Sequence, residues 1–459
     1  MYILVESKTG IMPKMPPPRF VITTPVGDIA LDPEEIRDVW AFVAESVGVD
    51  IQDEQIKEFL GDSIETKRDF YHSKSYIGWG NSMMEVINRD YEIEKIVNYN
   101  NRMSGEASPI WLDERIKKNG EEVRIKIPHK MTMYLRSKTD GHGLVIAFYP
   151  YDTYELDIMY HFCSEDAFDY TIWKNNLKDH FCTDGIYKNQ AVTADFDFLD
   201  NQQVDWKDIV LEESATTNLN RHVISFIDNL PKYREAGMRA SRGVLLTGPP
   251  GTGKTLCCSI LINQTDATVI YVTRNAVTER GQIDDLYKLA RFLAPTLVVF
   301  EDIDTLGGID REESDHPLLG EFLNCLAGVE ENDGVITLAT TNYPQNLDWA
   351  LADRPGRFDL RINFGFPDVK ARRLIFEKYL RNCDQKGIDY KAWAKKTEGY
   401  SGAYLRELAA LSIMIATEKS IGLTDDIISE AFRELEAQRS LVAKEKNLIR
   451  HSEESHDFM

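Results

Sequence analysis

Two stretches of this chain carry residue types that can handle phosphate. The first, GVLLTGPPGTGKT at residues 243–255, is an apolar run that leads into the pattern G-x-x-x-x-G-K-[ST]. Glycines let backbone N–H groups wrap phosphate oxygens, Lys254 can reach those oxygens with its ammonium group, and Thr255 can offer a hydroxyl to Mg²⁺. The residues predicted to bind a nucleotide here are Gly248, Pro249, Pro250, Gly251, Thr252, Gly253, Lys254, Thr255 and Leu256. An incidental lysine beside a glycine-rich turn is disfavoured, because the strand, the loop and all four fixed positions agree.

The second stretch is LVVFEDID at residues 297–304, in which four apolar residues run into an acidic pair. This pattern predicts a buried strand that delivers carboxylates to the phosphate site. Glu301 and Asp302 would share the metal shell with Thr255, and Asp302 would polarise the attacking water. A third strand, GVITLATTN, ends in Asn342, whose amide can orient that water. A core strand capped by solvated acids would be the ordinary interpretation if the acidic pair stood alone.

The elements that must position these residues follow from the texture of the chain. Residues 1–200 mix a helix that begins at Asp32 and Pro33 with strand-rich runs between 121 and 162, which predicts an α+β domain. Residues 204–366 alternate short apolar strands with amphipathic helices, which predicts an α/β core with a parallel sheet. Residues 367–438 carry helical spacing alone and predict a helical lid, and residues 439–459 read as a charged, flexible tail. The acidic segment 195–203 marks the first boundary.

Composition limits the class of protein. The 459 residues carry a formal net charge of −22, which disfavours a broad electrostatic grip on nucleic acid or anionic lipid. Six thinly spread cysteines indicate a reduced, cytoplasmic protein. The N-terminus lacks the basic and apolar regions of a signal peptide. The sequence contains no run of about 18 apolar residues, so no membrane span is predicted.

With GPPGTGKT, ATTN and RPGRFD on one chain, residues 204–408 resemble the AAA ATPases, and among them the protein-remodelling branch. The resemblance implies a P-loop NTPase fold, ATP and Mg²⁺ as cofactors, and a homo-oligomeric ring, usually a hexamer. It identifies Asn342 as the first sensor, and Arg354 and Arg357 as fingers that enter a neighbouring subunit's site. The segment that usually contacts adenine corresponds to Asp208, Ile209 and Val210.

The chain departs from the family pattern in three places. The usual Asp-Glu order is exchanged to Glu301-Asp302, an order also found in the AAA relatives that translocate the folded Rieske protein in mitochondria. The loop at residues 273–282, where threading motors present an aromatic residue, has none, and the nearby Tyr271 belongs to an apolar strand. Arg406 stands on the helix where close relatives rely on a Gly-Ala pair. It could touch the γ-phosphate or be a solvated helix residue.

Two HFC triplets are a weaker signal. His161, Cys163, His180 and Cys182 could in principle surround zinc if both triplets lie in strands, but their spacing matches no common zinc module. Packed histidines and cysteines are the simpler interpretation.

The leading hypothesis is an ATP-hydrolysing ring that remodels, disassembles or translocates a protein partner chosen by the N-terminal domain. A nucleotide-dependent scaffold or switch with little hydrolysis is the main alternative, because of the exchanged acids and the missing aromatic residue. A nucleic-acid motor is disfavoured by the acidic balance. A small-molecule kinase is disfavoured because such enzymes need no arginines placed for a neighbour's site.

Overall fold

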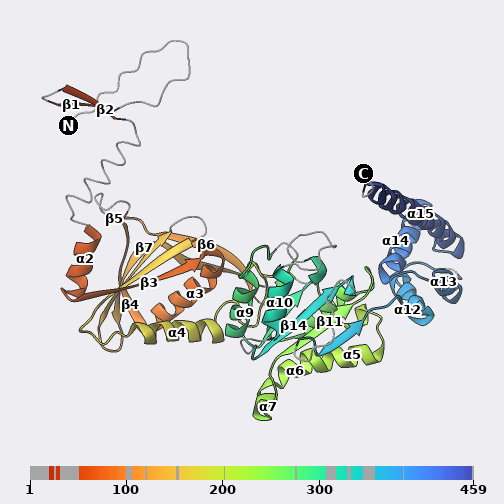
Figure 1. Cartoon of the computed structure of the whole chain (residues 1–459), viewed down its shortest axis with the longest axis horizontal. Helices are drawn as coiled ribbons and strands as arrows, with labels where there is room; N and C mark the ends of the chain where they lie inside the picture. The colour runs from red at the N-terminus through yellow and green to blue at the C-terminus, as the bar shows by residue number, and fades with distance from the viewer. Residues whose placement is uncertain are drawn as a thin grey trace. The chain divides into compact units, whose positions relative to one another are not determined.

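The computed structural model describes residues 20–24, 27–31, 51–99, 106–118, 121–150, 155–200, 202–273, 276–305, 317–327, 332–344, 357–385 and 387–456. The chain divides into two compact units (Figure 1). The first comprises Met1–Glu114 and Ile125–Leu177, and the second comprises Arg115–Arg124 and Lys178–Met459. The helix predicted to begin at Asp32 lies outside the described residues.

The first unit is built on an antiparallel seven-stranded sheet in the order β3-β9-β8-β7-β4-β5, with β6 beside β7. Its strands are β3 (Ile64–His72), β4 (Tyr91–Tyr99), β5 (Glu106–Ala107), β6 (Ile110–Lys118), β7 (Glu121–Ser137), β8 (Gly143–Pro150) and β9 (Glu155–Cys163). Its helices are α2 (Ile51–Leu60), α3 (Ser73–Asp90) and the first part of α4 (Tyr170–Thr183), and β1 (Phe20–Thr24) pairs separately with β2 (Gly27–Leu31). The predicted strand-rich run between 121 and 162 is confirmed as β7, β8 and β9.

The second unit contains a parallel six-stranded sheet in the order β10-β12-β13-β14-β11-β15. Its strands are β10 (Ala191–Thr193), β11 (Arg242–Thr247), β12 (Thr268–Val272), β13 (Thr296–Phe300), β14 (Val335–Thr341) and β15 (Leu360–Asn363). Every residue of β13 and β14 is buried, as expected for parallel strands covered on both faces. The predicted α/β core with flanking helices is confirmed.

Helices and helical turns connect these strands. They are η1 (Trp206–Asp208), α5 (Glu213–Leu219), the π-helical η2 (Asn220–Ile224), α6 (Ser225–Asp228), α7 (Leu230–Glu235), α8 (Lys254–Gln264), α9 (Gln282–Phe292), η3 (Ile303–Thr305) and α10 (Pro317–Ala327). Apolar side chains of α8, such as Cys257 and Leu261, join Val244 and Val299 of the sheet in one buried core. This core fixes the start of α8 above the end of β11.

The register of the sheet places the carboxyl ends of β11, β13 and β14 at the same end of the sheet. Thr247 at the end of β11 lies opposite Thr341 at the end of β14, and Phe300 at the end of β13 lies opposite Ala339. Gly248 continues the ladder by donating its N–H to the carbonyl of Thr341 at 3.3 Å. The loops after β11, β13 and β14 therefore leave the sheet side by side.

One strand lies on the other side of the predicted first boundary. β10 precedes the acidic segment 195–203, yet it pairs with β12, and the longer segment of the second unit begins at Lys178. A three-residue strand carries no detectable hydrophobic period, so the sequence pattern did not assign it to the parallel sheet.

The segment after β15 is helical, as predicted. It forms α12 (Val369–Leu380), α13 (Tyr390–Lys396), α14 (Gly402–Glu418) and α15 (Asp425–His456). The side chains of Asp368, Asp389 and Ser401 accept N–H groups from the first turns of α12, α13 and α14, which explains where these helices begin. Most of the predicted flexible tail continues α15, which reaches His456.

Candidate functional site

The loop after β11 has a backbone that only glycine tolerates well. Gly248, Gly251 and Gly253 have φ angles of +142°, +75° and +105°. A Cβ on Gly248 would lie 2.2 Å from the carbonyl oxygen of Phe364 on the neighbouring strand's exit. These glycines therefore set a loop whose N–H groups can turn toward an anion at the start of α8.

Lys254 is the first residue of α8 and is 6% exposed. Its Nζ donates to the carbonyl oxygens of Gly248 at 2.6 Å and Pro249 at 3.0 Å, and to Oδ1 of Asn342 at 2.7 Å. Burial lowers the pKa of Lys254 below its usual value, and the charges of Asp302 and two neighbouring carboxylates partly oppose that shift. A buried cation held among carbonyls and carboxylates suits the binding of phosphate oxygens.

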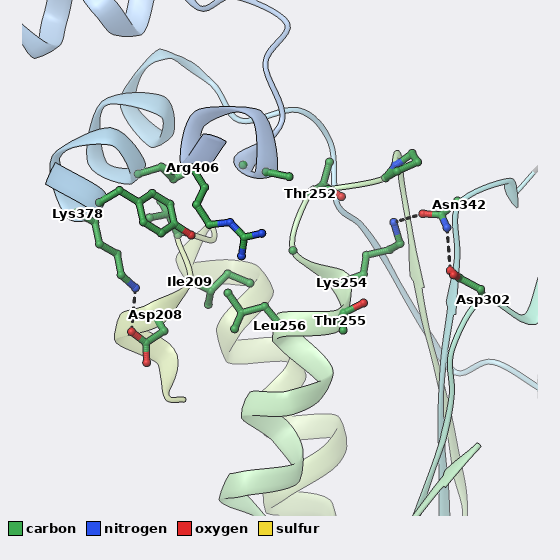
Figure 2. Close-up of a pocket in the computed structure, with 18 residues that line it drawn as sticks. Asp208, Ile209, Thr252, Lys254, Thr255, Leu256, Asp302, Asn342, Lys378 and Arg406 are labelled. Atoms are coloured by element: carbon green, nitrogen blue, oxygen red, sulfur yellow. Dashed lines mark hydrogen bonds and ion pairs between the residues drawn. The ribbon is translucent and has the colours of Figure 1, made fainter. Parts of the chain in front are cut away.

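Asp302 lies directly beside this lysine network. Its φ angle is +48°, an uncommon conformation for a residue other than glycine, and its N–H donates to Oγ1 of Thr340 at 2.9 Å. Its Oδ1 accepts the amide Nδ2 of Asn342 at 2.8 Å. Figure 2 shows the resulting hydrogen-bonded row from Lys254 through Asn342 to Asp302. The structure therefore brings together three residues that the sequence analysis selected, each of which follows a different strand.

Glu301 presents a buried carboxylate oxygen, Oε1, without a hydrogen-bond partner among the described residues. Tyr271 of β12 is half-buried against the core of the sheet, in the strand where it was predicted. Burial raises the pKa of the Tyr271 phenol, and the nearby Glu301 carboxylate raises it further. The Tyr271 phenol is thus an electrostatic neighbour of the first of the two exchanged acids.

Asp304 is a third acid that the sequence analysis did not select. Its Oδ1 accepts the hydroxyl of Thr341 at 2.7 Å and the N–H of Asn342 at 3.3 Å, while Oδ2 is buried without a partner among the described residues. Its position two residues after Asp302, on the turn η3, was the available signal. Asp304 ties the acidic turn to the end of β14.

A magnesium–nucleotide complex fits this set of donors. Oε1 of Glu301, which has no partner within the described part of the chain, and the hydroxyl of Thr255 are hard oxygen ligands, and Asp302 adds a second carboxylate. Glu301 and Thr255 would hold the ion, which when bound neutralises charge that develops on the phosphates.

A cavity of about 370 Å³ joins these residues to the helical lid. It is lined by Asp208, Ile209, Val210, Pro250, Gly251, Thr252, Gly253, Lys254, Thr255, Leu256, Asp302, Asn342, Ile375, Lys378, Tyr379, Gly402, Ala403 and Arg406. The predicted adenine segment, the phosphate loop and Arg406 therefore share one cavity. Ile375, Lys378 and Tyr379 of α12 were missed by the sequence analysis, since their helical spacing indicated only a packed helix.

The lid contacts the phosphate loop at the start of α14. The N–H of Ala403 donates to the carbonyl oxygen of Gly251 at 3.0 Å, and a Cβ on Gly251 would lie 2.8 Å from the Cβ of Ala403. The side chain of Arg406 enters the cavity on the side of Ile209 and Leu256 (Figure 2). Arg406 is thus a cavity residue, and its guanidinium lies away from Asn342 and Asp302.

Arg357 lies at the other end of the strands, next to the start of β11. A Cβ on Gly243, near the start of β11, would lie 1.9 Å from the carbonyl oxygen of Arg357, and Asp359 exchanges hydrogen bonds of 2.8 and 3.0 Å with Gly243. A strand rise of about 3.3 Å per residue places Gly243 roughly 16 Å from Gly248. The structure does not bring Arg357 to its own chain's phosphate loop, and Arg354 lies outside the described residues.

Other predicted features have plainer outcomes. The loop between β12 and α9 is described except at residues 274–275, and Tyr271 belongs to the strand before it.

His161 and Cys163 lie in β9, whereas His180 and Cys182 lie in the helix α4, so the assumption of two strands is wrong. Over the described part of the chain, no group of three or more His, Cys, Asp or Glu side chains is arranged to hold a metal ion. None of the helices described is long and apolar enough to cross a bilayer.

Comparison with known proteins gives one family. Residues 244–366 match the model of the ATPase family associated with various cellular activities (AAA). The chain is 31% identical over 274 residues to the ATP-dependent zinc metalloprotease FtsH of Lancefieldella parvula, covering 55% of this chain and 42% of that protein. It is 32% identical over 243 residues to the ATP-dependent zinc metalloprotease YME1L1 of Mus musculus, covering 50% and 34%. It is 35% identical over 219 residues to the ATPase family gene 2 protein of Saccharomyces cerevisiae, covering 45% and 28%. The chain covers less than half the length of each of these relatives.

Proposed function

We propose that this chain, which carries an ATPase domain of the AAA family, is an ATP-hydrolysing ring that remodels, disassembles or translocates a protein partner. The observation that supports hydrolysis is the hydrogen-bonded row of Lys254, Asn342 and Asp302, next to the buried Oε1 of Glu301, which no described residue contacts by a hydrogen bond. Lys254, Asn342 and Asp302 line one cavity with the phosphate loop, and Glu301 directly precedes Asp302 in the chain. In our proposal Lys254 binds phosphate, Asn342 and Asp302 orient the attacking water, and Glu301 binds the metal.

In our proposal the two exchanged acids have different roles. Glu301, directly after β13, binds the metal ion together with Thr255, while Asp302 orients and deprotonates the attacking water. The carboxylate of Asp302 accepts a proton from the attacking water, and the amide of Asn342 holds both the carboxylate and Lys254. The uncommon φ angle of Asp302 turns the acid that is one methylene shorter than Glu toward Asn342.

A ring is proposed because the arginine of the RPGRF segment is far from its own phosphate loop. Arg357 is fixed at the amino end of β11, so the phosphates it can reach belong to a neighbouring subunit. We infer a homo-oligomer, and a hexamer is the ring size that the resemblance implies. Arg354 is proposed as a second finger on the sequence pattern alone.

A protein is the proposed substrate because two of the relatives carry names of ATP-dependent metalloproteases. In this chain, the antiparallel sheet of the first unit is proposed to select the partner. The cytoplasmic location stays a prediction from the sequence.

Turnover of purified protein tests the proposal against the scaffold alternative. We expect Mg²⁺-dependent ATP hydrolysis that Asp302→Asn removes while nucleotide binding remains. A wild-type chain that binds ATP, assembles and never hydrolyses it would favour the scaffold.

Mixing variants tests the ring. Arg357→Ala and Lys254→Ala chains are each expected to be inactive, and their mixture should recover part of the activity at interfaces that pair an intact loop with an intact finger. Arg361→Ala, an exposed position on β15, is the matched control. Full activity of a monomer at high dilution would contradict the proposal.

A further inference from the structure

The far end of the cavity from Lys254 contains an ion pair that the proposed reaction does not use. Lys378 of α12 donates from Nζ to Oδ1 of Asp208 at 2.9 Å and to the carbonyl oxygen of Lys207 at 2.9 Å. Both Lys378 and Asp208 line the cavity, and Figure 2 shows the bond between them. The side chains of Lys378 and Asp208 are 20% and 38% exposed. The contact is therefore partly shielded from water and salt.

Asp208 is held rigidly on its other side. Its Oδ2 accepts the N–H of Asp205 at 3.0 Å, and Asp205 in turn accepts the N–H of Lys207 at 2.7 Å, which together form a capping box around η1. The hydrogen bond from Asp205 lowers the pKa of Asp208, and the bond and charge of Lys378 lower it further. The carboxylate is thus ionised at neutral pH, with both oxygens engaged by defined donors.

The segment that follows is the predicted adenine segment. We call residues 205–210 the strap. Ile209 is extended, with φ −119° and ψ 149°, and its Cδ1 lies 3.1 Å from where a Cβ on Gly253 would be. The strap therefore packs on the phosphate loop at one side and is bound to α12 at the other.

The helix α12 contributes more than this lysine to the cavity. Ile375 and Tyr379, three residues before and one residue after Lys378, line the same space and also pack on the lid core. Because Lys378 ties this turn of α12 to the strap, the ion pair joins the two walls of the cavity's far end.

We propose that Lys378 is a positioning residue of the nucleotide site, which through Asp208 holds the strap against the lid around the base of the nucleotide and slows nucleotide release. This inference rests on the proposed nucleotide-binding function. It assigns to Lys378 and Asp208 a share of the residence time of bound nucleotide rather than of the chemical step.

The test measures dissociation of a fluorescent ADP, mant-ADP, from the full chain in Mg²⁺. Lys378→Met keeps the apolar stem and removes the cation, and it is expected to raise the dissociation rate and the Kd about two- to fivefold, as for the loss of a partly exposed ion pair. Lys378→Arg keeps a cation and should recover most of the lost residence time. Lys370→Met, an exposed lysine on the same helix, should leave the rate unchanged.

A double-variant cycle shows whether the effect passes through Asp208. Asp208→Asn should raise the rate by a similar factor, and Lys378→Met added to Asp208→Asn should raise it no further. Added salt should speed release from the wild type more than from Lys378→Met. An unchanged rate in Lys378→Met, or independent and multiplying effects of the two substitutions, would overturn the inference.

The outcome also separates this inference from the proposed function. If the wild type binds mant-ADP and Lys254→Ala does not, the nucleotide site stands whatever Lys378→Met does. If the wild type binds no nucleotide, the proposed function itself fails.

Discussion

The two ends of the proposed nucleotide cavity are built in different ways. The phosphate end takes Lys254, Asn342 and Asp302 from loops at one edge of a parallel sheet, and its groups are tightly hydrogen-bonded. The base end is made by the strap and by α12, which are 170 residues apart between Asp208 and Lys378 and are joined by a partly exposed ion pair. The residues proposed for the chemistry follow strands of the sheet, whereas the surface proposed to surround the base is shared between the strap and the helical lid.

This difference predicts that substitutions at the phosphate end strongly reduce ATP hydrolysis or nucleotide binding. Substitutions at the base end should change nucleotide affinity only by small factors. The largest expected effect is at Asp302. Asp302→Asn removes the positioned base but keeps the shape of the side chain, so turnover should fall by about 10²-fold or more while ATP stays bound. Single-turnover hydrolysis with a parallel binding assay measures both quantities.

The neighbouring acid gives the contrast that defines the exchanged pair. Glu301→Gln should raise the Mg²⁺ concentration needed for half-maximal activity, because it weakens the metal shell. Asp302→Glu should be neutral or harmful, since the added methylene crowds a water placed for the shorter acid. An inert wild type that Asp302→Glu activates would show that the exchange is a lesion.

The second largest effect is expected at Lys254. Lys254→Ala removes a buried cation and leaves Asp302 and Asp304 without its compensating charge, so nucleotide affinity should fall by about 50-fold or more. Equilibrium titration with mant-ADP measures it, and Lys288→Ala on the exposed face of α9 is the control. Near-normal affinity would contradict the assignment of this loop.

Gly251 lies where the two ends meet, and an intermediate effect is expected there. Gly251→Ala places a Cβ 2.8 Å from that of Ala403 at a φ of +75°, so the lid should be pushed off the phosphate loop and affinity should fall about tenfold. Gly141→Ala carries the same backbone strain at φ +76°, with no atom of the described residues within 4 Å, and it should leave nucleotide affinity intact. Equal losses of nucleotide affinity in both variants would rule out the steric explanation.

The smallest effect is expected at Ile375. Ile375→Ala removes half-buried apolar surface from the base end, so affinity for mant-ADP should fall about three- to fivefold. Leu374→Ala, at an adjacent and 52% exposed position of the same helix, is the control and should change little. A loss at Ile375 as large as that at Lys254 would mean that the two ends do not differ as described.

The phosphate end could be predicted from the order of residues along the chain. A glycine loop, a lysine and acids after apolar strands are local patterns, and parallel strands necessarily bring their carboxyl ends to one edge. Lys254, Asp302 and Asn342 could therefore be selected from the sequence alone. The confirmed strands β7, β8 and β9 follow from the same kind of evidence, a hydrophobic pattern contained within one element.

The residues of the base end and the outer strand β10 could be identified only from the tertiary structure. The spacing of Lys378 and Ile375 is that of an ordinary amphipathic helix, and it does not indicate that α12 faces the strap. β10 is too short to show a period, and Asp304 acquires its hydrogen bonds to Thr341 and Asn342 only because η3 folds onto β14. The physical reason is common to these cases. A contact between distant segments depends on how whole elements pack, and the hydrophobic pattern of one element records only that it is buried, not which partner it meets.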